Sequence, residues 1–135
     1  MATKVSVITD HQKIPLSISF YPGNQHDAST IESSIELLKL KNKQINLVGD
    51  KGYIKNKKFR KKLKRKKITL ITPIRCNQKN NYLTVEEKEL LKQRSLVEHV
   101  FMRLKMIKRV HVRYDRLIDS FRGICYIGLI MKLWN

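Results

Sequence analysis

The sequence predicts one mixed α/β domain, which begins with a β-hairpin and continues with alternating helices and strands. Two strand-like runs flank a short polar connection near the N-terminus, and two short apolar runs follow, separated by segments with helical periodicity. The 135 residues, 41% of them hydrophobic, suffice for one core and are too few for two domains of ordinary size. We therefore expect residues 1–135 to form a single domain.

The N-terminal segment predicts the hairpin. Val5–Ile8 and Ile14–Phe20 are strand-like, and the polar residues between them make a connection of hairpin length. Asp10 lies in this connection. We interpret it as a turn residue, because Asp side chains accept hydrogen bonds from the backbone of their own turn.

A helix is expected next. The turn residues at 21–27 end the second strand. Asp27 or Ser29 is then expected to cap a helix that runs to about Leu40, and Glu32 completes a capping box to Ser29. We therefore interpret Asp27 as a structural residue.

The remaining elements alternate between strand and helix. Thr84–Glu87 has the pattern of a capping box, which marks the start of a long helix. In order we expect a buried strand at Ile45–Gly49, a helix at Lys55–Lys67, a strand at Ile68–Ile71, the long helix that contains Glu98, and an apolar helix at about Leu117–Leu133.

Charge limits the class of partner. Lys and Arg number 29 against 11 acidic residues, and the net charge of +18 favours DNA or RNA as the partner. The most apolar stretch, Ile124–Met131, is shorter than the ~20 residues that span a bilayer. The N-terminus shows no signal-peptide pattern, and Cys76 and Cys125 have neither metal-ligand spacing nor a disulfide framework. We expect a protein of the reducing cytoplasm.

The cations are concentrated. Residues 51–67 include 11 Lys or Arg and no acid, whereas a solvated helix face usually mixes both signs. A general bias of the composition toward Lys is the alternative, and it explains the clustering less well than phosphate contact does. With a second basic stretch at 103–116, the expected DNA-binding residues are Lys51, Lys55, Lys57, Lys58, Arg60, Lys61, Lys62, Lys64, Arg103, Lys108, Arg109 and Arg113.

Two acidic residues stand within this basic sequence. Asp50 directly follows an apolar strand-like run, and Glu98 lies in the long helix. On a helix that advances about 100° per residue, positions 91, 94, 98 and 105 fall within a sector of about 60°, so Arg94, Glu98 and Lys105 share a face. An ordinary amphipathic helix with an Arg94–Glu98 pair, worth about 0.3–0.5 kcal/mol, is the alternative.

These residues resemble insertion-sequence transposases of the DDE class. One subset has its third acidic residue in the pattern Tyr, two residues, Arg, three residues, Glu, six residues, Lys. Arg94, Glu98 and Lys105 match this pattern, and Leu91 stands where the pattern has Tyr. The order of elements is that of a ribonuclease H-like mixed sheet with flanking helices that lacks its first strand. In complete members of the family that strand carries the first Asp.

The resemblance implies metal-dependent cleavage and transfer of DNA strands at transposon ends. Asp50 and Glu98 are then the metal ligands, for Mg²⁺ or in its place Mn²⁺, and Arg94 and Lys105 complete the catalytic residues. The implied partners are transposon-end and target DNA, and an upstream-encoded part of the transposase. Without the first Asp we expect an incomplete two-metal site and an inactive chain, either part of a split enzyme or a decayed remnant. A non-enzymatic basic module that binds DNA or RNA is the alternative.

Overall fold

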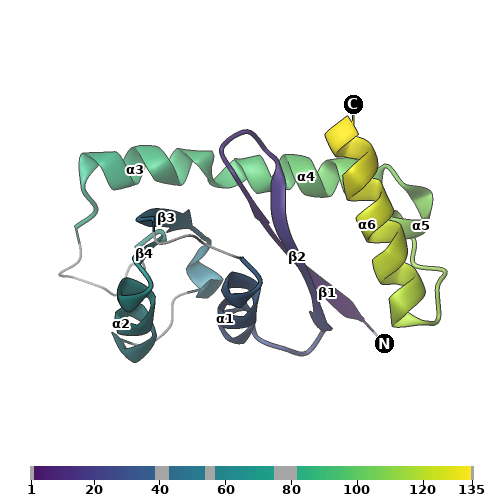
Figure 1. Cartoon of the computed structure of the whole chain (residues 1–135), viewed down its shortest axis with the longest axis horizontal. Coiled ribbons are helices and arrows are strands. Elements are labelled where there is room, and N and C mark those ends of the chain that lie inside the picture. Colours follow the sequence, from purple (N-terminus) through teal and green to yellow (C-terminus); the bar gives the residue numbers. More distant parts are fainter. Residues whose placement is uncertain (1, 39–42, 54–56, 75–81, 135) are drawn as a thin grey trace.

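The computed structural model describes residues 2–38, 43–53, 57–74 and 82–134 and has the predicted mixed α/β architecture. Figure 1 shows the strands lying between α1 and α2 on one side and the line of α3 and α4 on the other. The short helix α5 was not expected from the sequence. In chain order the elements are β1 (Thr3–Thr9), β2 (Pro15–Pro22), α1 (Asp27–Glu36), β3 (Ile45–Val48), the 3-10 turn η1 (Lys51–Tyr53), α2 (Lys57–Arg65), β4 (Ile68–Ile71), α3 (Val85–Lys92), the 3-10 turn η2 (Gln93–Ser95), α4 (Leu96–Lys105), α5 (Lys108–His111) and α6 (Ile118–Trp134).

The predicted hairpin is confirmed. β1 and β2 pair in antiparallel fashion, with Val7 opposite Ile18. Asp10 shapes the turn between them, because its Oδ1 accepts hydrogen bonds from the backbone N–H of Gln12 at 2.9 Å and of Ile14 at 2.8 Å. The interpretation of Asp10 as a turn residue is therefore also confirmed.

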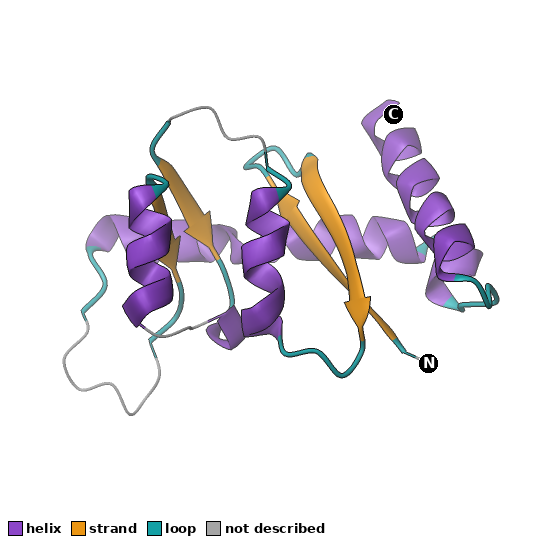
Figure 2. Cartoon of the chain, turned by 60° about the horizontal axis from the view of Figure 1, so that its bottom comes forward, coloured by secondary structure: helices purple, strands orange, loops and turns teal. Residues whose placement is uncertain are grey.

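The predicted strands β3 and β4 form a second, separate pair. They run parallel, with Ile45 opposite Ile68, and α2 lies in the connection, as parallel strands require. Among the described residues each of the four strands consequently has one edge without a strand partner. Figure 2 shows the two pairs side by side, with α1 in front of them and the α3–α4 line behind.

Two clusters of buried side chains stabilise the fold. The hairpin core lies where the hairpin meets α4 and α6, and it consists of Ile18, Val100, Leu104, Phe121, Cys125 and Leu129. The parallel-pair core consists of Ile31, Ile35, Phe59, Leu63 and Ile68. β1 contributes to both, because alternate residues of a strand point to opposite faces: Val5 and Val7 pack on the hairpin core, and Ile8 packs on the other.

Helix α1 begins earlier than the cap prediction required. Its N-cap is His26, whose side chain makes no cap hydrogen bond, and Asp27 is the first helical residue. The expected capping box of Ser29 and Glu32 is therefore wrong. Ser29 already lies in the first turn, where its Oγ donates to the His26 carbonyl, and Glu32 pairs with Lys62 of α2. The helix ends at Glu36, before the expected end; position 40 lies outside the described residues.

The long helix predicted around Glu98 is divided by a tighter turn. Its capping box is confirmed: the Thr84 side chain accepts from the Glu87 N–H at 3.2 Å, and the Glu87 carboxylate accepts from the Thr84 N–H at 2.9 Å. At Gln93–Ser95, however, the backbone forms a 3-10 turn. Such a turn advances about 120° per residue rather than about 100°, so three residues rotate α4 by about 60° relative to α3. The phase of Glu98 relative to Leu91 thus differs from that on a straight helix.

Helix α2 confirms the predicted helix within the described residues, although position 55 lies outside them. Phe59 and Leu63, four residues apart, are 6% and 3% exposed and form its narrow apolar stripe. Lys67 has a φ of 59°, in the left-handed region that ends helices. The chain then enters β4.

Helix α6 coincides closely with the predicted C-terminal helix. Phe121, Cys125 and Leu129 form its buried stripe. Its opposite face includes the exposed side chains of Ile127 and Ile130. Within the described part of the chain, no helix is both long and apolar enough to cross a bilayer.

The packing of α4 generates a test of the fold. Leu104 is 2% exposed in the hairpin core, so Leu104→Ala is expected to lower the free energy of unfolding by about 2–5 kcal/mol. Met106 is 77% exposed, and Met106→Ala is expected to change that free energy by no more than about 0.5 kcal/mol. Urea unfolding followed by circular dichroism measures both. Equal midpoints for the two variants contradict this arrangement of α4.

Candidate functional site

Asp50 lies at the carboxyl end of β3. The Gly49 N–H still donates to the Ile71 carbonyl at 2.9 Å, so β4 holds the backbone up to the residue before Asp50. Asp50 Oδ1 accepts the Lys51 N–H at 2.8 Å, and 68% of the Asp50 side chain is exposed. The carboxylate is thus oriented by the start of η1 and remains accessible to a ligand.

Arg94 connects the Asp50 carboxylate to the segment between α3 and α4. Its Nη1 lies 3.1 Å from Asp50 Oδ1, across 44 positions of sequence. Arg94 belongs to η2, and Glu98 follows in the first turn of α4, about 6 Å of helix rise further on. The structure therefore brings Asp50 to the segment that bears Glu98. Direct proximity of the two carboxylates stays a prediction.

Helix α4 has one face buried in the hairpin core and carries exposed polar side chains on its remaining surface. Val100 and Leu104 are 4% and 2% exposed in the hairpin core, whereas Glu98 and Lys105 are exposed. Seven residues, about 10 Å of rise, separate Glu98 from Lys105. Both heads can therefore meet a ligand on a helix whose position is fixed by packing.

A polar cluster beside Asp50 was missed by the sequence analysis. Lys4 Nζ of β1 donates to Asp27 Oδ1 at 2.8 Å. Burial, and then the negative charges of Asp27 and Asp50, raise the pKa of Tyr53, which also hydrogen-bonds to Ser6 of β1. The cluster joins the end of β3 to β1. No spacing in the sequence signals it, because its members come from three separate elements.

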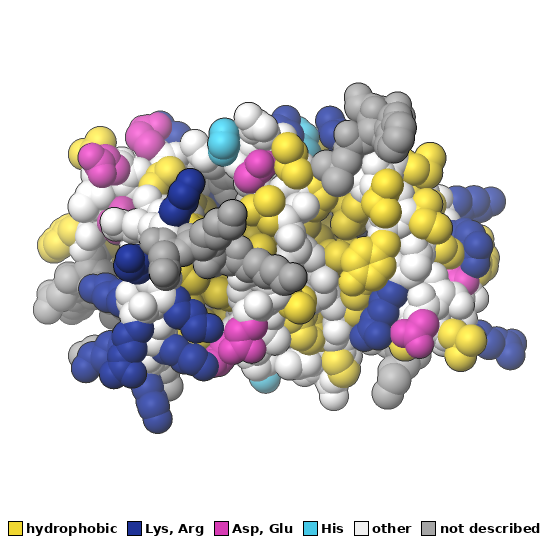
Figure 3. All heavy atoms as spheres, viewed as in Figure 1, with side chains coloured by type: hydrophobic (Ala, Val, Ile, Leu, Met, Phe, Trp, Pro, Cys, Tyr) yellow, Lys and Arg dark blue, Asp and Glu magenta, His cyan; other side chains and the backbone are white. Residues whose placement is uncertain are grey.

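The expected basic surface is present on α2. In Figure 3, Lys and Arg side chains gather over this helix at the lower left. Lys62 donates a hydrogen bond to Glu32, which raises the pKa of Lys62, so this cation is tied to α1. Lys55 lies outside the described residues, and of Lys57 only the backbone is described. We call the following exposed residues the α2 surface: Lys58, Arg60, Lys61, Lys62, Lys64 and Arg65.

The other expected DNA-binding residues divide into two groups. Lys51, Arg103 and Lys108 are exposed. Arg109 instead pairs with Asp115 at 2.5 Å. Arg113 donates to the Asp115 carbonyl at 3.1 Å, and its guanidinium lies 5.2 Å from the centre of the Phe121 ring. Arg109 and Arg113 thus hold the segment before α6, and their contact with DNA stays a prediction.

Comparison with family models identifies the domain. Residues 2–117 match the family described as the transposase DDE domain. The chain belongs to this family. The match runs from β1 through α5 and ends directly before α6. Comparison with curated proteins, and with solved structures, gave no match. Membership confirms the resemblance to DDE-class transposases.

Transposases of the DDE class act on DNA and use divalent metal ions. The donors suit such ions in kind, because Mg²⁺ prefers carboxylate oxygens and both Asp50 and Glu98 are exposed. They fall short in number. In the part of the transposase domain that the structure describes, no three His, Cys, Asp or Glu side chains are grouped to hold a metal ion. A metal site at Asp50 and Glu98 stays a prediction.

The exposure of the Asp50–Arg94 pair predicts that it adds little to stability. The two side chains are 68% and 45% exposed, and pairs of this kind contribute about 0–1 kcal/mol. Asp50→Asn and Arg94→Gln are each expected to change the free energy of unfolding by less than about 1 kcal/mol, measured by urea unfolding. A loss of several kcal/mol contradicts this assignment and indicates that the pair is structural.

Proposed function

We propose that this chain is the C-terminal part of a ribonuclease H-like transposase domain that cleaves DNA at transposon ends and joins it to target DNA. Asp50 and Glu98 serve as metal ligands, and Arg94 and Lys105 contact the reacting DNA strand. The ion pair of Asp50 with Arg94 carries the proposal, because it sets the strand-end carboxylate beside the helix that bears Glu98.

Each residue has a defined task in this proposal. Bound Mg²⁺, or Mn²⁺, activates the attacking oxygen and stabilises the leaving oxygen. Asp50 and Glu98 supply hard oxygen ligands from two elements. Arg94 presents a planar guanidinium, which matches phosphate geometry, and Lys105 neutralises a neighbouring phosphate from the end of α4. The α2 surface follows the DNA backbone without reading sequence.

The arrangement of the strands supports a missing central strand. β1 and β3 belong to separate sheets, yet Ile8 of β1 and Leu47 of β3 pack on the same parallel-pair core. Removal of a strand that once paired with both leaves this arrangement. We propose that such a strand carries the remaining metal ligand. It comes from an upstream segment of a longer chain or from a separate polypeptide.

The site of action that we propose is the cytoplasm. Cys125 is 0% exposed, and burial raises the pKa of its thiol to about 11. The thiol is therefore protonated and unreactive at neutral pH. Cys125 is also free of any disulfide, which agrees with a reducing compartment.

The incomplete ligand set predicts that residues 1–135 alone do not cleave or join transposon-end DNA with Mg²⁺ or Mn²⁺. A polypeptide that adds an upstream Asp-bearing strand is expected to do both, and Asp50→Asn or Glu98→Gln in it abolishes the reaction. End-labelled DNA resolved on a gel measures each step. If residues 1–135 cleave DNA and Asp50→Asn stops them, a third ligand is already present, and Asp27 is the next residue to replace.

The α2 surface predicts salt-dependent binding to duplex DNA. Log affinity is expected to fall with log salt by about 0.9 per phosphate neutralised. Replacing Lys58, Arg60, Lys61 and Lys64 together with Gln is expected to weaken binding and flatten this slope. Asp50→Asn and Glu98→Gln are expected to leave affinity unchanged or slightly higher, because they remove negative charge near phosphate. Fluorescence anisotropy titrations at several salt concentrations measure these effects.

A charge-matched control separates position from net charge. Replacing Lys43, Lys88, Lys92 and Arg116 with Gln removes the same charge from other exposed positions. If both variants weaken binding equally, the α2 surface has no special role.

The one-signed face of α2 also favours a second candidate, a non-enzymatic DNA- or RNA-binding module. DNA binding together with an inactive longer polypeptide supports that alternative.

A further inference from the structure

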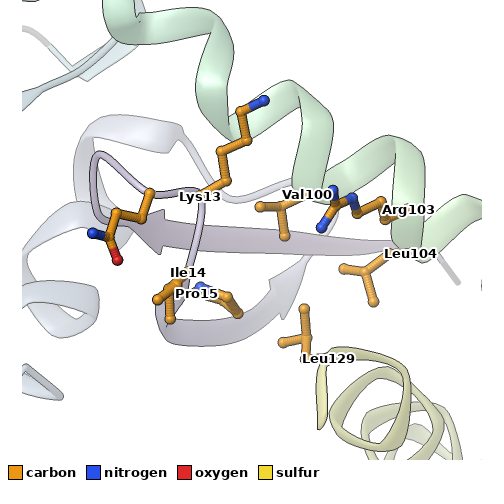
Figure 4. Close-up of a pocket in the computed structure, with 8 residues that line it drawn as sticks. Lys13, Ile14, Pro15, Val100, Arg103, Leu104 and Leu129 are labelled. Carbon is orange, nitrogen blue, oxygen red and sulfur yellow. The ribbon is translucent and has the colours of Figure 1, made fainter. Parts of the chain in front are cut away.

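A cleft beside α4 has no role so far. It has a volume of about 160 Å³ and lies between the hairpin turn, α4 and α6. Its apolar floor comes from Val100 and Leu104 of α4 and Leu129 of α6. Figure 4 shows Lys13 reaching from the turn toward α4, where Arg103 lies. The cleft thus combines an apolar floor with polar walls and has two cations at its rim.

The two cations of the cleft carry charge that the described part of the chain does not neutralise. Among the described residues, Lys13 and Arg103 form no ion pair with an acidic side chain. In a chain of net charge +18, two unpaired cations beside one recess repel each other. An anionic ligand removes this repulsion.

The backbone of Lys13 points to the same conclusion. Its φ is 66°, in the left-handed region that Gly adopts freely and other residues adopt at an energetic cost. A hairpin turn of this kind commonly has Gly at the left-handed position. Gly would suit position 13 of the turn better than Lys does. The Lys therefore keeps a cation at the cleft. Such strain is found at functional sites more often than elsewhere.

The size of the cleft limits the ligand. Its volume is close to that of a cavity of roughly 150 Å³, which accepts benzene, and is below the roughly 300 Å³ of small-molecule pockets. One single-ring group therefore fits. The ligand must combine that ring with negative charge outside the recess, which is the chemistry of a pyrimidine nucleotide in a single strand.

We propose that the cleft takes one unstacked pyrimidine base of a DNA strand, while Lys13 and Arg103 contact the phosphates on either side of it. The inference rests on the proposed action on DNA and adds a second contact point along α4. Arg103 lies five residues beyond Glu98, about 7.5 Å of helix rise, which equals about two base steps at 3.4 Å each. Five residues also turn the helix by about 140°, so a strand that contacts both Glu98 and Arg103 passes around α4.

The test compares two single-stranded oligonucleotides of twelve units, oligothymidylate and a backbone of the same length without bases. Fluorescence anisotropy with the full chain is expected to show about fivefold tighter binding of oligothymidylate. Ile14 lines the cleft and is 38% exposed, so Ile14→Ala is expected to abolish most of that ratio without unfolding the protein. Leu16, 53% exposed and outside the cleft, provides the control Leu16→Ala, which keeps the ratio.

Lys13→Gly tests the cation with little risk to the fold, because Gly adopts the left-handed conformation without strain. It is expected to weaken binding of both oligonucleotides severalfold and to reduce the salt slope by about 0.7, the value for one phosphate of a single strand. An unchanged affinity and slope overturn the role of Lys13.

The remaining outcomes separate this inference from the proposed function. If both oligonucleotides bind equally and binding depends on the α2 surface, DNA binding stands and the base-binding cleft is overturned. If neither oligonucleotide binds, the proposed action on DNA and the cleft are overturned together.

Discussion

Helices, rather than backbone hydrogen bonds, hold the two strand pairs of this chain together. α1 packs its Ile31 and Ile35 into the parallel-pair core, onto which Ile8 of β1 also packs. On the other side, α4 is fixed to the hairpin core by Leu104, and Arg94 in the turn before α4 pairs with Asp50, just after the end of β3. The candidate site therefore exists only where these helices meet both pairs. A change in the helix packing moves Glu98 relative to Asp50 without touching either residue.

Local patterns predicted most of the elements. The hairpin turn at Asp10 and the capping box at Thr84 depend on contacts between residues two to four positions apart, which a sequence displays directly. The start of α1 was predicted wrongly because Asp27 and Ser29 are both good caps, and neither is the cap that forms. The 3-10 turn at Gln93–Ser95 and the Lys4–Asp27 contact depend on tertiary packing. The spacing of residues along the sequence does not reveal tertiary packing.

The candidate site shows the same division. Arg94 was predicted from its spacing to Glu98, and it is the residue found against Asp50. The basic residues were predicted by their density, and density does not distinguish a cation that faces solvent from one used within the fold. Arg109 belongs to the second kind, since Asp115 holds it. On α2 the distinction is simpler, because Phe59 and Leu63 turn a narrow stripe inward and leave the cations outside.

The unpaired strand edges have a consequence for the chain in solution. An exposed edge is a template for pairing with another extended segment, and charged side chains along the edge are a common protection against it. β1 contains one charged residue, Lys4, which is bound to Asp27, and β3 contains none. Repulsion between whole molecules of charge +18 therefore adds protection against edge-to-edge aggregation. Because salt screens that repulsion, concentrated salt favours association between copies of the chain.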